Sequence, residues 1–299
     1  MQTKDRRFRA VDVVLLTLTV LPFLAGILIK LFFVPPSTGI DITGAYVFFT
    51  LPTPLQPLPI TESQVNSWLV VLALLFLSLY MTHGIRAGRK TKRQVIAEWI
   101  VEKTEDLVKG NMGDYFLGFA PFVAAIMAIS AFSSLLSLLG LFPPTSDLNV
   151  VGGWAILVFF LITWYKLKCG PVYYLKSFCE PVAFFAPINI VSELATPVAM
   201  SFRHYGNVLS GIVISVLVSA GLSGLSNLLL GWLPGVLGEI PFLRIGLPAV
   251  LSVYFDLFSG CLQAFIFAML TMLYVAGAFS PEEYQKRKDK AAARRARRA

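Results

Sequence analysis

Three ionisable residues, Glu193, Arg203 and Asp256, stand inside long apolar stretches of the sequence. A charged side chain at the centre of a bilayer costs at least about 2.5–3.5 kcal/mol, so such residues are retained where they face a partner, water or an ion pathway. In that setting, carboxylates and a guanidinium can bind, release or repel a cation. These residues are therefore the first candidates for a functional site.

Polar residues recur around these charges at helical spacing. Offsets of three, four and seven residues place side chains on one face of an α-helix. Two such stripes imply an intramembrane polar pathway. They comprise Glu193, Thr196, Met200, Arg203, Asn207 and Ser210 in the first, and Asp256, Ser259, Gly260 and Gln263 in the second.

A structural role is the alternative for Arg203, which would then pair with Glu193 or Asp256 to hold two helices together. Buried ion pairs are weak evidence for stability. Glu193 lies ten residues away, about 15 Å along a helix axis, and Asp256 lies on another predicted helix. We therefore expect Arg203 to be free to interact with something else.

The composition places these charges in a membrane protein. Hydrophobic residues make up 56% and charged residues 14% of the 299 residues, with mean hydropathy +0.72, against about 45–50% and 25% in soluble proteins. We predict an all-α membrane protein with about six membrane-crossing helices, the last two long and tilted, plus a cytoplasmic interfacial amphipathic helix at 94–109. The predicted spans are 11–33, 65–81, 116–142, 151–165, 181–220 and 249–279.

The net charge of +8 could indicate a nucleic-acid-binding protein, but its distribution argues against one. Four blocks, 4–9, 86–109, 166–176 and 286–298, hold 22 of the 25 lysines and arginines. All four fall on one side of the membrane if the chain crosses six times, as the positive-inside rule expects. We predict that both termini are cytoplasmic and that nucleic acid is not a partner.

Helix-breaking residues separate the spans. Residues 34–64 contain six prolines and no Lys or Arg, so we expect an external loop there. The fifth apolar stretch exceeds one crossing of about 20 residues and must tilt or kink. Residues 221–246, rich in Gly, Ser and Pro, should form another external connection, and the low-complexity residues 291–299 should be disordered.

The cysteines and histidines show no ligand spacing. Three cysteines and two histidines are scattered along the chain, so we predict no metal site, no cofactor and no catalytic residue. The sequence lacks a Walker GxxxxGK[ST] motif for nucleotides, and it offers too few paired histidines and acids for an intramembrane enzyme. A polytopic ion or small-molecule transporter using intramembrane Arg, Asp and Glu is the alternative, although no internal repeat supports it.

Four motifs resemble subunit a of F-type ATP synthases. Residues 201–207, Ser-Phe-Arg-His-Tyr-Gly-Asn, resemble its Arg-Leu-Phe-Gly-Asn signature, and 187–193, Pro-Ile-Asn-Ile-Val-Ser-Glu, resemble its Pro-x-Asn-x-x-x-Glu motif. Residues 144–150, Pro-Thr-Ser-Asp-Leu-Asn-Val, resemble its Pro-Thr-x-Asp-Leu-Asn-Val loop, and 262–267, Leu-Gln-Ala-Phe-Ile-Phe, match its final helix. The resemblance suggests three regions: an additional transmembrane helix and Pro-rich loop at 1–63, an ion-translocating membrane domain at 64–279 and a basic cytoplasmic tail at 280–299.

The resemblance implies a non-catalytic stator subunit in a bacterial plasma membrane. Its partners would be the c-ring, b-type peripheral-stalk subunits and membrane lipid. Two half-channels would pass protons or sodium ions to and from the c-ring carboxylates and so couple ion flow to ATP synthesis. Arg203 would face the ring, where a permanent cation favours the ionised form of an approaching carboxylate and blocks leakage between the half-channels.

The resemblance also assigns roles to the other polar residues. Asn207 and Gln263 would orient Arg203 or water, or make plain helix–helix hydrogen bonds. Asp256 is assigned to the outer half-channel, and Glu193 either lines a half-channel or makes interhelical contacts. His204, where the family has Leu, either assists Asp256 or fills a packing site.

One departure from the family concerns the proton relay. Ile212 stands nine residues after Arg203, where the family commonly has Glu or His. The usual acid–imidazole pair is therefore absent from its usual places, and the sequence leaves open which residues replace it.

Overall fold

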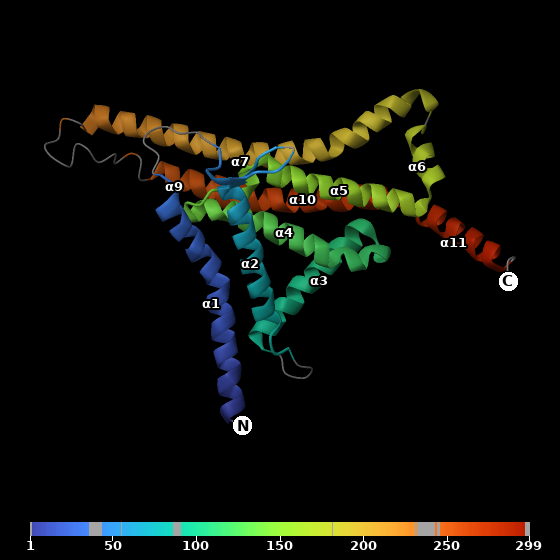
Figure 1. Ribbon diagram of the computed structural model, residues 1–299, viewed down its shortest axis with the longest axis horizontal. Helices are drawn as coiled ribbons and strands as arrows, with labels where there is room; N and C mark the ends of the chain where they lie inside the picture. The colour runs from blue at the N-terminus through green and yellow to red at the C-terminus, as the bar shows by residue number, and fades with distance from the viewer. Residues whose placement is uncertain are drawn as a thin grey trace.

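Six long apolar helical stretches dominate the computed structural model, which describes residues 2–35, 44–54, 56–85, 91–180, 182–230, 232, 243 and 246–296 (Figure 1). They confirm the predicted all-α membrane fold. The stretches are α1 (Gln2–Phe33), α2 (Glu62–Thr82), η1 (Asp114–Phe119) with α4 (Ala120–Leu135), α5 (Leu148–Cys169), α7 (Ala186–Leu230), and α9 (Leu247–Ser252) running through η6 (Val253–Ser259) into α10 (Gly260–Gly277). The other α-helices of the described residues are α3 (Lys92–Met112), α6 (Pro171–Phe178) and α11 (Pro281–Ala296).

Helices α1 and α2 form an antiparallel pair beside the main bundle (Figure 1). Gly26 favours their close approach, because a Cβ there would lie 3.1 Å from the Leu141 side chain and 3.2 Å from that of Leu69. Between them, part of the predicted loop forms a hairpin of β1 (Val47–Leu51) and β2 (Leu58–Thr61). Pro52, Pro54 and Pro57 fall between the two strands, whereas Pro59 lies in β2 opposite Thr50. Both strands of a two-stranded hairpin are edge strands, where proline is tolerated.

The main bundle packs α4, α5 and α10 around a shared apolar core, and α7 lies against α5 (Figure 1). Val123 of α4, Val158 of α5 and Met272 of α10 are fully buried. A close contact also fixes α10 against α4, because a Cβ on Gly260 would lie 2.7 Å from the Ser134 Cβ. A side chain at Gly260 would therefore push the two helices apart.

Helix α7 is longer than the sequence predicts. It spans 45 residues, or about 68 Å at 1.5 Å per residue, so it must tilt strongly to stay within a bilayer. The expected connection at 221–246 is wrong over its first ten residues, because the helix continues to Leu230. Gly and Ser interrupt helices in water, but backbone groups in hydrocarbon are satisfied only within a helix.

The last span contains an unpredicted irregularity. Its segment η6 is a π-helix that includes Asp256, so hydrogen bonds there link residues five apart. The predicted stripe from Asp256 to Gln263 assumes regular α-helical spacing and does not hold across this segment. Single turns of π-helix are frequent at functional sites.

The basic C-terminal segment is helical over most of its length. Helix α11 begins with Pro281, which suits a first helical turn, and carries Glu282 and Glu283 near its positive end. The expectation of disorder at 291–299 is wrong as far as Ala296, and residues 297–299 lie outside the described residues.

We predict that Gly260→Ala destabilises the protein by about 1–3 kcal/mol, because its methyl group overpacks the contact with Ser134. Gly152→Ala in α5 is the matched control, since a Cβ there meets nothing within 4 Å. Alanine at that position should be neutral or stabilising through helix propensity. Thermal unfolding of the two purified variants measures the difference, and equal midpoints would contradict the packing argument.

Candidate functional site

Arg203 lies in the interior of α7 with its side chain exposed. Within the part of the chain that the structure describes, it makes no ion pair and no hydrogen bond. The surrounding surface is apolar, with Phe202 55% and Val198 53% exposed. Arg203, Phe202 and Val198 are all exposed, so this side of α7 is uncovered.

The structure pairs Glu193 with Lys166 and not with Arg203. The Lys166 Nζ lies 2.8 Å from Glu193 Oε2, and the Tyr174 hydroxyl donates to Oε1 at 3.3 Å. The Glu193 side chain is 11% exposed. Burial and the neighbouring Glu193 carboxylate raise the pKa of the Tyr174 phenol, so this hydroxyl remains a donor at neutral pH.

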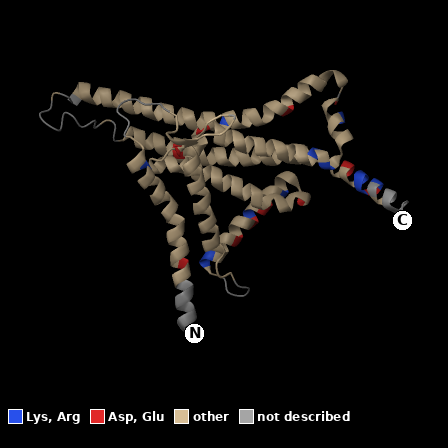
Figure 2. Ribbon diagram, viewed as in Figure 1, with Lys and Arg blue, Asp and Glu red and all other residues tan. Residues whose placement is uncertain are grey.

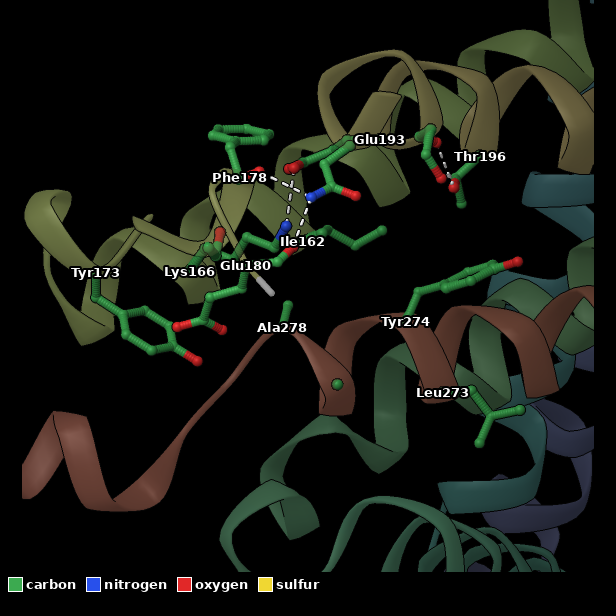
Figure 3. A pocket seen from close by; sticks show the side chains of 14 residues that line it. Ile162, Lys166, Tyr173, Phe178, Glu180, Glu193, Thr196, Leu273, Tyr274 and Ala278 are labelled. Atoms are coloured by element: carbon green, nitrogen blue, oxygen red, sulfur yellow. Dashed lines mark hydrogen bonds and ion pairs between the residues drawn. The ribbon is translucent and has the colours of Figure 1, made fainter. Parts of the chain in front are cut away.

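Lys166 and Glu193 line a cavity of about 450 Å³ between α5, α6, α7 and α10 (Figure 3). Asn189 closes one side of it by donating to the backbone carbonyls of Phe178 and Glu180 at 2.7 and 2.8 Å. Thr196, one turn after Glu193, also lines the cavity. The first part of the predicted α7 stripe therefore borders a polar space.

Further along α7, Asn207 fastens the helix to the π-helical segment. Its side-chain amide donates to the Ser259 hydroxyl at 2.7 Å. Asp256 in the same segment is half-buried and accepts a hydrogen bond from Ser252. Gln263 is only 5% exposed and makes no side-chain hydrogen bond with the described residues. The structure thus joins Asn207 to η6 but does not bond Gln263 or Asp256 to Arg203.

His204 is completely buried among α4, α5 and α10. Its Nε2 lies 3.3 Å from the Ser130 hydroxyl, and the rings of Trp154 and Phe267 pack edge-on against it. Its Nδ1 and the Ser133 hydroxyl have no partner within the described chain. Buried polar atoms without protein partners usually bind ordered water. His204 therefore fills a packing site and also offers polar atoms that could join a path of water molecules.

A second polar cluster, which the sequence analysis did not select, lies where α2 and α5 begin. The Ser63 hydroxyl donates to Asp147, the N-cap of α5, and the Asn66 amide donates to the Phe142 carbonyl at 2.9 Å. Glu62 is 5% exposed and accepts from the Phe142 amide at 3.4 Å. In the sequence, this cluster could have been found from Glu62, an acidic residue at the start of an apolar span.

Serines on α4 connect this cluster with His204. The Ser134 hydroxyl lies 3.2 Å from that of Thr145, two residues before Asp147 in the chain, and Ser130, which contacts His204, lies one turn earlier in α4. Distances along α5 locate His204 between the two ends, because Trp154 packs against it. Trp154 is seven residues, about 10 Å, from Asp147 and twelve residues, about 18 Å, from Lys166. Polar regions thus lie at both ends of the bundle, with His204 between them.

Comparison with known proteins identifies the family. Residues 64–276 match the family model described as ATP synthase A chain. The chain is 26% identical over 228 residues to ATP synthase subunit a of Legionella pneumophila strain Paris, covering 76% of this chain and 90% of that protein. It is 35% identical over 213 residues to ATP synthase subunit a of Acidothermus cellulolyticus, covering 68% and 70%.

A third relative carries an ion specificity in its name. The chain is 26% identical over 243 residues to the Propionigenium modestum protein named ATP synthase subunit a, sodium ion specific, covering 76% of each. The match of the family model and these relatives confirms the resemblance drawn from the four motifs. The chain belongs to the ATP synthase A chain family.

Proposed function

We propose that this chain is the non-catalytic stator subunit that passes protons or sodium ions to and from a rotating c-ring. The observation that carries the proposal is Arg203, exposed on an apolar surface of α7 and free of partners in the described residues. A counter-charge for this cation has to come from outside the described chain, and a c-ring carboxylate supplies it. Family membership favours this reading over a small-molecule transporter.

Arg203 acts through its permanent charge. A cation beside an approaching carboxylate favours its ionised form, so the carboxylate releases its ion before it passes. Arginine is not deprotonated in proteins, so the same group repels cations that would leak between the two sides. One elementary charge gains about 2.3 kcal/mol per 100 mV across the membrane, so several ions are needed for each ATP made elsewhere in the complex.

The cavity at Glu193 is the proposed inner access route. Lys and Arg gather in α3, at the end of α5 and in α11, and α6 carries Lys176 (Figure 2). The positive-inside rule places these regions in the cytoplasm. Both termini are then cytoplasmic in a bacterial plasma membrane. The b-type stalk subunits and the surrounding lipid complete the proposed partners.

The Glu62–Asp147 cluster is the proposed outer access route. It continues through the α4 serines to His204, whose unpartnered Nδ1 can exchange a proton with water. This histidine replaces the relay group that Ile212 lacks. Asp256 approaches from η6 on another side of α7 and assists from there.

Replacing Arg203 tests the central step. Arg203→Ala should abolish ATP-driven ion pumping in membrane vesicles while the complex still assembles, because no other permanent cation remains on the exposed face of α7 in the described residues. Lys103→Ala removes an exposed cation from α3 and is the matched control, with pumping unchanged. Pumping retained in Arg203→Ala would refute the mechanism.

Replacing His204 separates the outer route from simple packing. His204→Phe keeps an aromatic ring between Trp154 and Phe267 but removes proton exchange, so pumping should slow by at least about tenfold. Met200→Leu, a volume-conserving change in a residue 2% exposed, is the control for disturbed packing. Equal pumping rates in the two variants would show that His204 only fills space.

A further inference from the structure

A second, larger cavity opens between the corner of α5 and α6 and the C-terminal helix α11. Its volume is about 660 Å³, and it is separate from the polar regions assigned to ion transport except for Tyr173 and Glu180, which border both cavities. Four basic side chains and two acidic ones line it. They are Lys176, Lys286, Arg287, Lys290, Glu180 and Glu283.

Arg287 fixes α11 against the end of α5. Its guanidinium donates to the backbone carbonyls of Leu167 and Lys168, in the last turn of α5, at 2.8 and 2.9 Å. The corner itself needs Gly170, whose φ of +132° is unfavourable for other residues. The basic residues of the two helices are therefore held facing one cavity.

Positive charge remains in surplus inside this cavity. Lys286 contacts Glu283 at 2.8 Å, and the pKa of that carboxyl is lowered first by this hydrogen bond and further by the charges of Lys286, Lys290 and Lys176. Three lysines thus act on one carboxylate. Lys176 and Lys290 make no ion pair within the described chain, so both can bind a further anion.

The rim of the cavity is apolar on the side of α6. Val172, which lines the cavity, is 78% exposed, and the neighbouring Leu175 is 66% exposed. Trp164, near the end of α5, is 59% exposed, and tryptophans at span ends lie at the level of lipid headgroups. A ligand that fits both surfaces carries an anionic group and a hydrocarbon chain.

We propose that this cavity binds the phosphate of an anionic phospholipid, with Lys176 and Lys290 as donors and the acyl chains against Val172 and Leu175. Basic pockets on the cytoplasmic side of membrane helices suit such headgroups. Free phosphate would use the lysines but leave the apolar rim exposed. The lipid would hold α11 and α6 together at the cytoplasmic surface.

The test uses the full chain in phosphatidylcholine vesicles with a photoreactive phosphatidylglycerol at low mole fraction. Crosslinks should appear on α6 or α11 peptides and fall about 25-fold in Lys176→Gln/Lys290→Gln, since each basic residue contributes about fivefold in affinity. Lys92→Gln/Lys103→Gln removes two cations from α3, outside the cavity. This control should label like the unchanged chain.

Two competitors identify the source of the phosphate. Unlabelled phosphatidylglycerol should abolish the crosslinks, whereas millimolar inorganic phosphate should leave them intact. Equal loss in the two double variants, or displacement by inorganic phosphate, would overturn the proposal. Because no pumping is measured, the result is independent of the proposed ion transport.

Discussion

Hydrocarbon offers no hydrogen bonds to a charge, and this constraint explains where the ionisable residues of the bundle lie. Glu193 is neutralised by Lys166 at one end, and Asp12 is held by Arg93 at 2.7 Å. At the other end, Asp147 accepts from Ser63 and from a backbone amide. Arg203 has no such partner in the described chain, so the structure is electrostatically incomplete where we place the c-ring.

The contact between α7 and the last span determines where Arg203 points. Asn207, one turn after Arg203, is tied to Ser259 at 2.7 Å, and Gly211 admits Phe255 so closely that a Cβ would lie 3.0 Å from it. Both partners belong to the π-helical segment η6. These two contacts restrict rotation of α7 about its axis, so a long side chain on an uncovered helix still has a defined direction.

The sequence predicted the features that follow from the cost of burying charge: six apolar spans and the position of Arg203 among them. It did not predict the π-helix, because seven residues are too few for the changed hydrogen-bond pattern to alter the spacing of apolar residues recognisably. The continuation of α7 to Leu230 was missed because Gly and Ser count as breakers in water. Glu62 was missed because its partner Phe142 is 80 residues away in sequence.

The departure at Ile212 has a geometric explanation. Consecutive residues of an α-helix point about 100° apart, so His204 faces α4 and α5 while Arg203 stays exposed. Nine residues at about 100° each place Ile212 on the side of α7 opposite Arg203, about 80° around the helix from His204. Moving the titratable group to His204 shifts the proposed outer route around the helix toward the α4 serines. The proposed relay group can therefore change its position around α7 while the contacts of Asn207 and Gly211 with η6 keep Arg203 in place.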